Sequence, residues 1–153
     1  MQVQRLKTGE GPRGMTHVAI ISYGQGDFSA AATTQTYTLA TLASGDLVGY
    51  PLAFVYVKTA VTGITTPTIV VGHAGDTDFL VPSGSIATAA RVLPPVAVSA
   101  AAGGAFTGAT NATLQAVVSS GSENWSAATA GEIHIFFNLN RINEDINTMA
   151  TLS

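Results

Sequence analysis

The chain has 153 residues, of which 46% are hydrophobic and only 10% are charged, against about 25% charged in an ordinary soluble domain. Six basic and nine acidic side chains give a formal net charge of −3, which argues against a broad basic surface for nucleic acid. The absence of cysteine excludes disulfides, cysteine-ligated zinc and thiol catalysis, and the length fits one domain with its own core.

The first predicted segment, residues 1–14, is an extended N-terminal arm. It holds three of the six basic side chains of the chain, and its four Gly and Pro residues disfavour regular structure. Because the arm cannot form a core of its own, we expect an external surface to order it through charged and small apolar contacts. The predicted contact residues of the arm are Val3, Arg5, Leu6, Lys7 and Arg13.

The folded domain is predicted over residues 15–140, where runs of β-branched and aromatic residues alternate with turn residues. The predicted strands are 16–22, 34–42, 52–58, 68–71, 78–81, 96–99, 112–119 and 131–139. Residues 82–84 are expected to end the fifth of these strands. Residues 86–93 are predicted to form a short helical turn or an irregular crossover, and residues 100–108 a loop with Phe106 turned inward. The tail, residues 141–153, is predicted to be a short helix or to lack ordered structure.

Two of these strands have the most informative side-chain patterns. Strand 52–58 is apolar on both faces, which favours a central position in a sandwich. Strand 131–139 alternates most regularly, with Ile133 and its odd-numbered neighbours on one face and Glu132, His134 and Phe136 on the other. The residues expected to be buried, inside the sandwich or at a subunit interface, are Phe54, Tyr56, Ile133, Ile135 and Phe137.

About eight short strands without a long amphipathic helix predict an all-β fold. The predicted architecture is an antiparallel β-sandwich, jelly-roll-like, with the extended N-terminal arm attached. The immunoglobulin-like alternative lacks its characteristic cysteines and is less favoured. No apolar run is long enough to cross a membrane and no secretory signal is visible, so no membrane partner is expected.

Residues with catalytic or metal-binding chemistry are few. His73, Asp76 and Asp78 have the residue types of a metal site, but their spacing is better explained by a polar hairpin turn. Glu132 and His134 lie two residues apart on one strand face and are interpreted as surface polar residues. The sequence therefore predicts a protein that is not an enzyme, with no metal, no cofactor and no small-molecule substrate.

Trp125, the only tryptophan, lies in the polar loop 119–130. Two interpretations remain open for it. The ring packs over the end of the sandwich, or it projects as a contact to a protein or a sugar, in the second case together with Tyr23. Trp125 is therefore added to the candidate contact residues.

Four segments rich in Ala, Thr, Gly and β-branched residues carry a resemblance to a known group of proteins. They are residues 32–39, 56–61, 70–80 and 128–135. Over about residues 15–140 the chain resembles the small β-sandwich proteins that decorate or cement the heads of tailed bacteriophages. The resemblance implies a jelly-roll-like fold without catalytic residues. It also implies homotrimers at three-fold or quasi-three-fold positions on the capsid exterior, bound to the major capsid protein and reinforcing the shell against packaged DNA.

The functional hypothesis from the sequence is therefore a virion structural protein, a capsid cement or decoration subunit. The first alternative is a head-fibre, tail or baseplate subunit. The second is a carbohydrate-binding module for host attachment, which depends on an exposed Trp125. The low charge density is consistent with subunit contacts, whose centres are depleted in charged residues.

Overall fold

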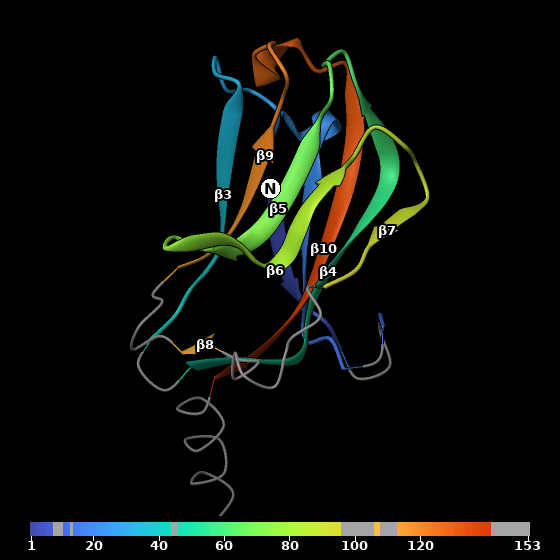
Figure 1. Ribbon diagram of the computed structural model, residues 1–153. Coiled ribbons are helices and arrows are strands. Elements are labelled where there is room, and N and C mark those ends of the chain that lie inside the picture. Colours follow the sequence, from blue (N-terminus) through green and yellow to red (C-terminus); the bar gives the residue numbers. More distant parts are fainter. Residues whose placement is uncertain (8–10, 13, 44–45, 96–105, 108–112, 142–153) are drawn as a thin grey trace, which may run out of the picture.

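The computed structural model describes residues 1–7, 11–12, 14–43, 46–95, 106–107 and 113–141 (Figure 1). Within this part the chain forms two antiparallel sheets, so the predicted all-β sandwich is confirmed. The predicted strand at 96–99 and the predicted tail, apart from Arg141, lie outside the described residues, as does Arg13.

The first sheet has the order β1-β2-β10-β4-β7, with β8 also paired to β4. Its strands are β1 (Gln2–Arg5), β2 (His17–Ser22), β4 (Asp46–Thr62), β7 (Arg91–Leu93), β8 (Phe106–Thr107) and β10 (Ala130–Arg141). The second sheet has the order β3-β9-β5-β6. Its strands are β3 (Thr34–Thr41), β5 (Thr68–His73), β6 (Asp76–Ser85) and β9 (Thr113–Ser119).

Figure 1 shows the second sheet lying across the first, with β3 at its outer edge. In the described part of the chain, two short 3-10 helices, η1 (Tyr23–Gln25) and η3 (Trp125–Ala127), lie in connections between strands. Most connections cross from one sheet to the other, as in a sandwich of Greek keys. This strand order is compatible with the jelly-roll-like arrangement, and that finer assignment stays a prediction.

The core lies between the two sheets and follows the two-residue period of the strands. On β10, Ile133, Ile135 and Phe137 are fully buried, as predicted. Phe54 and Tyr56 of β4 are only half-buried, because the side chains that β4 turns inward are those of Ala53, Val55 and Val57. The expectation that Phe54 and Tyr56 lie inside the sandwich is therefore wrong, and a subunit interface for them stays a prediction.

Three predicted connecting segments differ from the structure. Residues 82–84 do not end the strand there, because β6 runs on to Ser85. As an edge strand, β6 can hold Pro82 without losing a ladder hydrogen bond. Residues 86–93 contain no helix, and Arg91–Leu93 pairs with β4 as β7. Residues 106–107 were expected to lie in a loop, but they pair with β4 as β8.

The N-terminal arm differs most from its prediction. Residues 2–5 form β1, which pairs with β2 from Gln2↔Ile20 to Arg5↔His17. The exposed edge of β2 supplies the surface that orders this part of the arm. The prediction that ordering requires an external partner is therefore wrong for residues 2–5.

Candidate functional site

The candidate site is the outer surface of the first sheet, which we call the aromatic face. It consists of the outward-facing residues Val18, Ile20, Phe54, Tyr56, Val92, His134 and Phe136. The strand register fixes this grouping, because residues paired directly across antiparallel strands point to the same side of a sheet. One row runs Ile20, His134, Tyr56, Val92 and a second runs Val18, Phe136, Phe54.

The rings of the aromatic face contact one another across β4 and β10. Phe54 and Phe136 stack with centroids 4.9 Å apart and planes 19° apart. Tyr56 meets His134 edge to face at 6.3 Å. All four are only half-buried, and Val92 beside them on β7 is 55% exposed. One side of each Phe ring is occupied by the other ring, and the exposed part of the pair forms an apolar surface of the type that contacts protein side chains.

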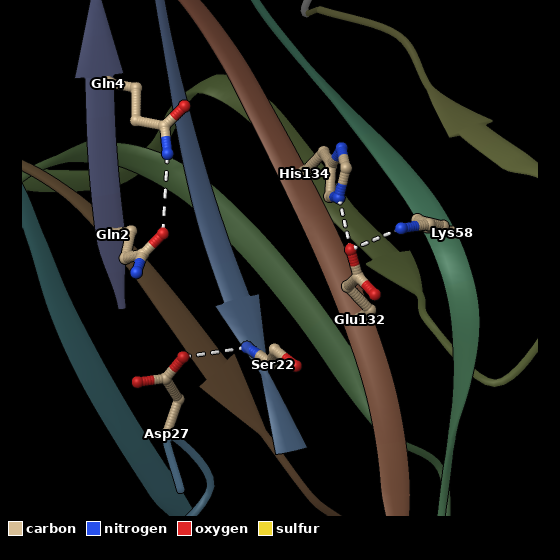
Figure 2. A network of polar contacts seen from close by, with 7 residues as sticks. All are labelled: Gln2, Gln4, Ser22, Asp27, Lys58, Glu132 and His134. Atoms are coloured by element: carbon tan, nitrogen blue, oxygen red, sulfur yellow. Dashed lines mark hydrogen bonds and ion pairs between the residues drawn. The ribbon is translucent and has the colours of Figure 1, made fainter. Parts of the chain in front are cut away.

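A polar cluster borders the aromatic face at one end (Figure 2). The Glu132 carboxylate contacts Lys58 Nζ at 2.9 Å and His134 Nε2 at 2.7 Å through the same oxygen. Lys58 reaches this position because β4 has a bulge here, so that Lys58 lies between the pairs Glu132↔Thr59 and Ile133↔Val57. The predicted placement of Glu132 and His134 on one strand face is confirmed.

The pKa of Glu132 is lowered, first by the hydrogen bond to His134 and then by Lys58. A lowered pKa means that ionised Glu132 stabilises the fold at neutral pH, and that this contribution is lost as pH falls below the ordinary value of 4.5.

We therefore expect Glu132→Gln to have an unfolding free energy about 0.2–1 kcal/mol lower than that of the wild type at pH 7. When the pH falls below 4.5, the unfolding free energy of this variant should decrease less than that of the wild type. Urea unfolding at a series of pH values measures this difference. Lys58→Gln is the matched control and should keep most of the acid dependence, because His134 is the larger cause. Identical acid dependence in wild type and Glu132→Gln would contradict the assignment.

The outer surface of the second sheet differs in chemistry from the aromatic face. Its rows pair Thr36 with Val117 and Val70, and Thr38 with Gln115. Thr36 and Thr38 are exposed. The two outer surfaces are thus one aromatic and one rich in threonine.

Trp125 is fully buried in η3 and does not reach the surface. Its indole Nε1 donates to the Thr33 carbonyl oxygen at 3.1 Å, and its ring packs on Phe28 at 5.3 Å. The surrounding loop is fixed by Glu123, whose carboxylate accepts hydrogen bonds from the Thr65 hydroxyl and amide, and these lower the pKa of Glu123 to about 2. The structure supports the interpretation that Trp125 caps the sandwich, and leaves no exposed indole for a sugar or a capsid contact.

The arm residues lie along and beyond β1. Val3 and Arg5 are exposed on β1, 41% in the case of Val3, and Lys7 is exposed after it. Leu6 is half-buried and packs near Gly11, where a Cβ would lie 2.9 Å from Leu6 Cδ1. The structure therefore leaves Val3 and Arg5 exposed on β1 and turns Leu6 toward its own loop.

The start of β1 is fixed by Asp27. One oxygen of this carboxylate forms an ion pair with the Met1 ammonium group, and the other accepts from the Ser22 amide at 2.8 Å. The Tyr37 hydroxyl donates to the Asp27 carbonyl oxygen at 2.8 Å. Burial, and secondarily the charge of Asp27, raise the pKa of Tyr37 above its ordinary value.

The other two histidines, His73 and His17, contact residues of their own sheets. His73 pairs with Asp76 across the β5–β6 hairpin, and its Nδ1 accepts from the Gly75 amide at 3.1 Å. His17 stacks on Phe137 with centroids 5.3 Å apart. Among the described residues, no three His, Cys, Asp or Glu side chains gather as a metal site requires. No helix in this part of the chain has the length and apolarity needed to span a bilayer.

The structure does not bring all the predicted contact residues to one surface. The arm lies at the edge of the first sheet, Trp125 is internal, and Arg13 is not described. The aromatic face was missed as a surface, although its signal was present in the sequence. In a two-layer sandwich each strand turns only one face toward the core. A strand with two apolar faces, such as 52–58, therefore indicates an apolar outer surface.

Comparison of the chain with protein-family models, with curated proteins and with solved structures found no match.

Proposed function

We propose that the chain is a non-enzymatic structural subunit of a virion, a capsid cement or decoration protein that acts as a homotrimer on the exterior of a phage head. The observation that carries this proposal is the aromatic face, where rings stay half-exposed on the side of a sheet that the core does not need. Aromatic residues with few charges are typical of the centre of a protein–protein interface.

The occupant proposed for the aromatic face is a second copy of the chain. Charge is compatible with this choice, because the lysine and the glutamate that border the face, Lys58 and Glu132, neutralise each other and leave no net charge there to repel a second copy. The exposed Arg5 and Lys7 of the arm are the proposed contacts to an acidic surface of the major capsid protein. No nucleic acid, membrane or small-molecule ligand enters this proposal.

The test of the trimer is Phe54→Asp. A buried charge without a partner costs several kcal/mol, so we expect the variant to lose the trimer contact and to have one third of the mass of the wild type at micromolar concentration. Light scattering or mass photometry measures the difference. Val70→Asp is the matched control, since Val70 is half-buried on the outer surface of the second sheet, is separated from β3 by β9, and should leave the mass unchanged. A monomeric wild type would contradict the trimer.

Immuno-electron microscopy of phage particles from the source culture tests the position on the virion. Labelling of heads by antibodies against the chain supports a decoration subunit. Labelling confined to tails or fibres would replace it with the tail or head-fibre alternative, and unlabelled particles would contradict a virion role.

A further inference from the structure

The edges of the two sheets are not equally protected against pairing with another chain. An exposed edge strand offers unpaired backbone groups, and proteins normally shield it with charges, proline, bulges or short length. Of the edge strands in the described part of the chain, β1 has four residues and ends in Arg5, and β7 has three residues beginning with Arg91. β6 carries Asp76, Asp78, Pro82 and two register shifts.

β3 is the exception. It has eight residues, Thr-Gln-Thr-Tyr-Thr-Leu-Ala-Thr, without charge, proline or glycine. It pairs only with β9 among the described strands, and the register is regular from Thr34 to Thr38 before a shift. Thr34, Thr36 and Thr38 are exposed, while the side chains of Tyr37 and Leu39 are buried in the core. A neutral edge with regular register and without charge or proline is the type of surface to which another strand adds.

From these observations we propose that β3 pairs with β3 of a second copy, antiparallel about a two-fold axis centred on Thr36. The second sheets of the two copies then form one continuous sheet. With this centre, Thr36 pairs with Thr36 of the second copy. Thr34 of each copy pairs with Thr38 of the other. Every outward cross-strand pair is thus Thr–Thr, a favourable pair in antiparallel sheets.

The absence of charge on β3 also favours its own copy as the partner. In a two-fold contact each residue meets the same surface on the other subunit, so any charge near the axis would oppose itself. This contact uses a different surface from the aromatic face and goes beyond the proposed trimer. With its two-fold axes perpendicular to the three-fold axis of the trimer, this contact would join two trimers into a closed assembly of six chains.

The experiment compares Thr36→Lys, Thr36→Glu and their mixture with the wild type by light scattering. Thr36 is exposed, so each variant should keep the circular dichroism of the folded chain. We expect either variant alone to have half the mass of the wild type, because like charges face each other across the axis. An equimolar mixture should regain the full mass, and the neutral control Thr36→Val should keep it throughout.

The outcomes separate this proposal from the trimer. A wild type of six chains that falls to three with Thr36→Lys supports both contacts, whereas a fall from two chains to one supports the β3 contact alone. Equal masses for wild type and Thr36→Lys overturn the β3 contact, and if both are trimers the proposed function still stands. A Lys and Glu mixture that stays at half the mass also overturns it.

Discussion

Replacing Phe137 with alanine is expected to lower the free energy of unfolding by about 3–5 kcal/mol. Phe137 is fully buried, lies on the central strand β10, and stacks on His17 of β2. Removal of the ring leaves a cavity that neighbouring strands cannot close without breaking their own register. Urea unfolding followed by the fluorescence of Trp125 measures the loss.

Phe136→Ala is the matched control for Phe137→Ala, because it removes the same ring from the next residue on the opposite face. Phe136 is half-buried, so a clearly smaller loss is expected. Both variants are measured at one protein concentration, since subunit association adds to the apparent stability. A loss below about 1 kcal/mol for Phe137→Ala would contradict its place in the core.

Trp125→Ala is expected to cost a similar amount, about 3–5 kcal/mol. The indole fills the end of the sandwich against Phe28 and ties the loop to the carbonyl of Thr33. Trp125→Phe keeps most of the ring and loses only that hydrogen bond, so it should cost about 1 kcal/mol from the bond and somewhat more from reduced packing. Circular dichroism follows unfolding here, because the variants lack the fluorescent residue.

The same variants decide between capping and sugar binding for Trp125. If Trp125 caps the sandwich, Trp125→Ala lowers the unfolding free energy and the wild type binds no glycan. A stable Trp125→Ala protein that no longer binds a polysaccharide recognised by the wild type would restore the carbohydrate-binding hypothesis.

The strands of the sandwich could be predicted wherever the sequence alternates between one apolar and one polar face. In β10 the fully apolar positions Ile133, Ile135 and Phe137 specify the inner face without further information. In β4 the alternation does not specify it, because Phe54 and Tyr56 are as apolar as Val55 and Val57. Only the register with β10, which pairs Phe136 with Phe54 and Ile135 with Val55, decides which set faces the core.

Contacts between residues distant in sequence explain the other differences between the predictions and the structure. The arm was predicted to need a partner because nothing in residues 1–14 indicates that the edge of β2 is available to pair with residues 2–5. Trp125 lies in a polar loop, and its burial depends on Phe28 and Thr33, which are distant in sequence. The unshielded edge at β3 likewise became visible only when the sheet order showed which strands have a free side.

The direction of β1 relative to β10 has a mechanical consequence. Both strands run antiparallel to β2, which lies between them, so they point the same way. Tension applied between Gln2 and Arg141 therefore pulls from opposite ends of the sheet. Because ladder hydrogen bonds lie perpendicular to the strands, such a force loads the bonds of the four β1–β2 residue pairs together and does not open them one by one. The sheet is thus oriented to resist stretching along its strands, the load that a subunit fixed at both ends would experience on an expanding surface.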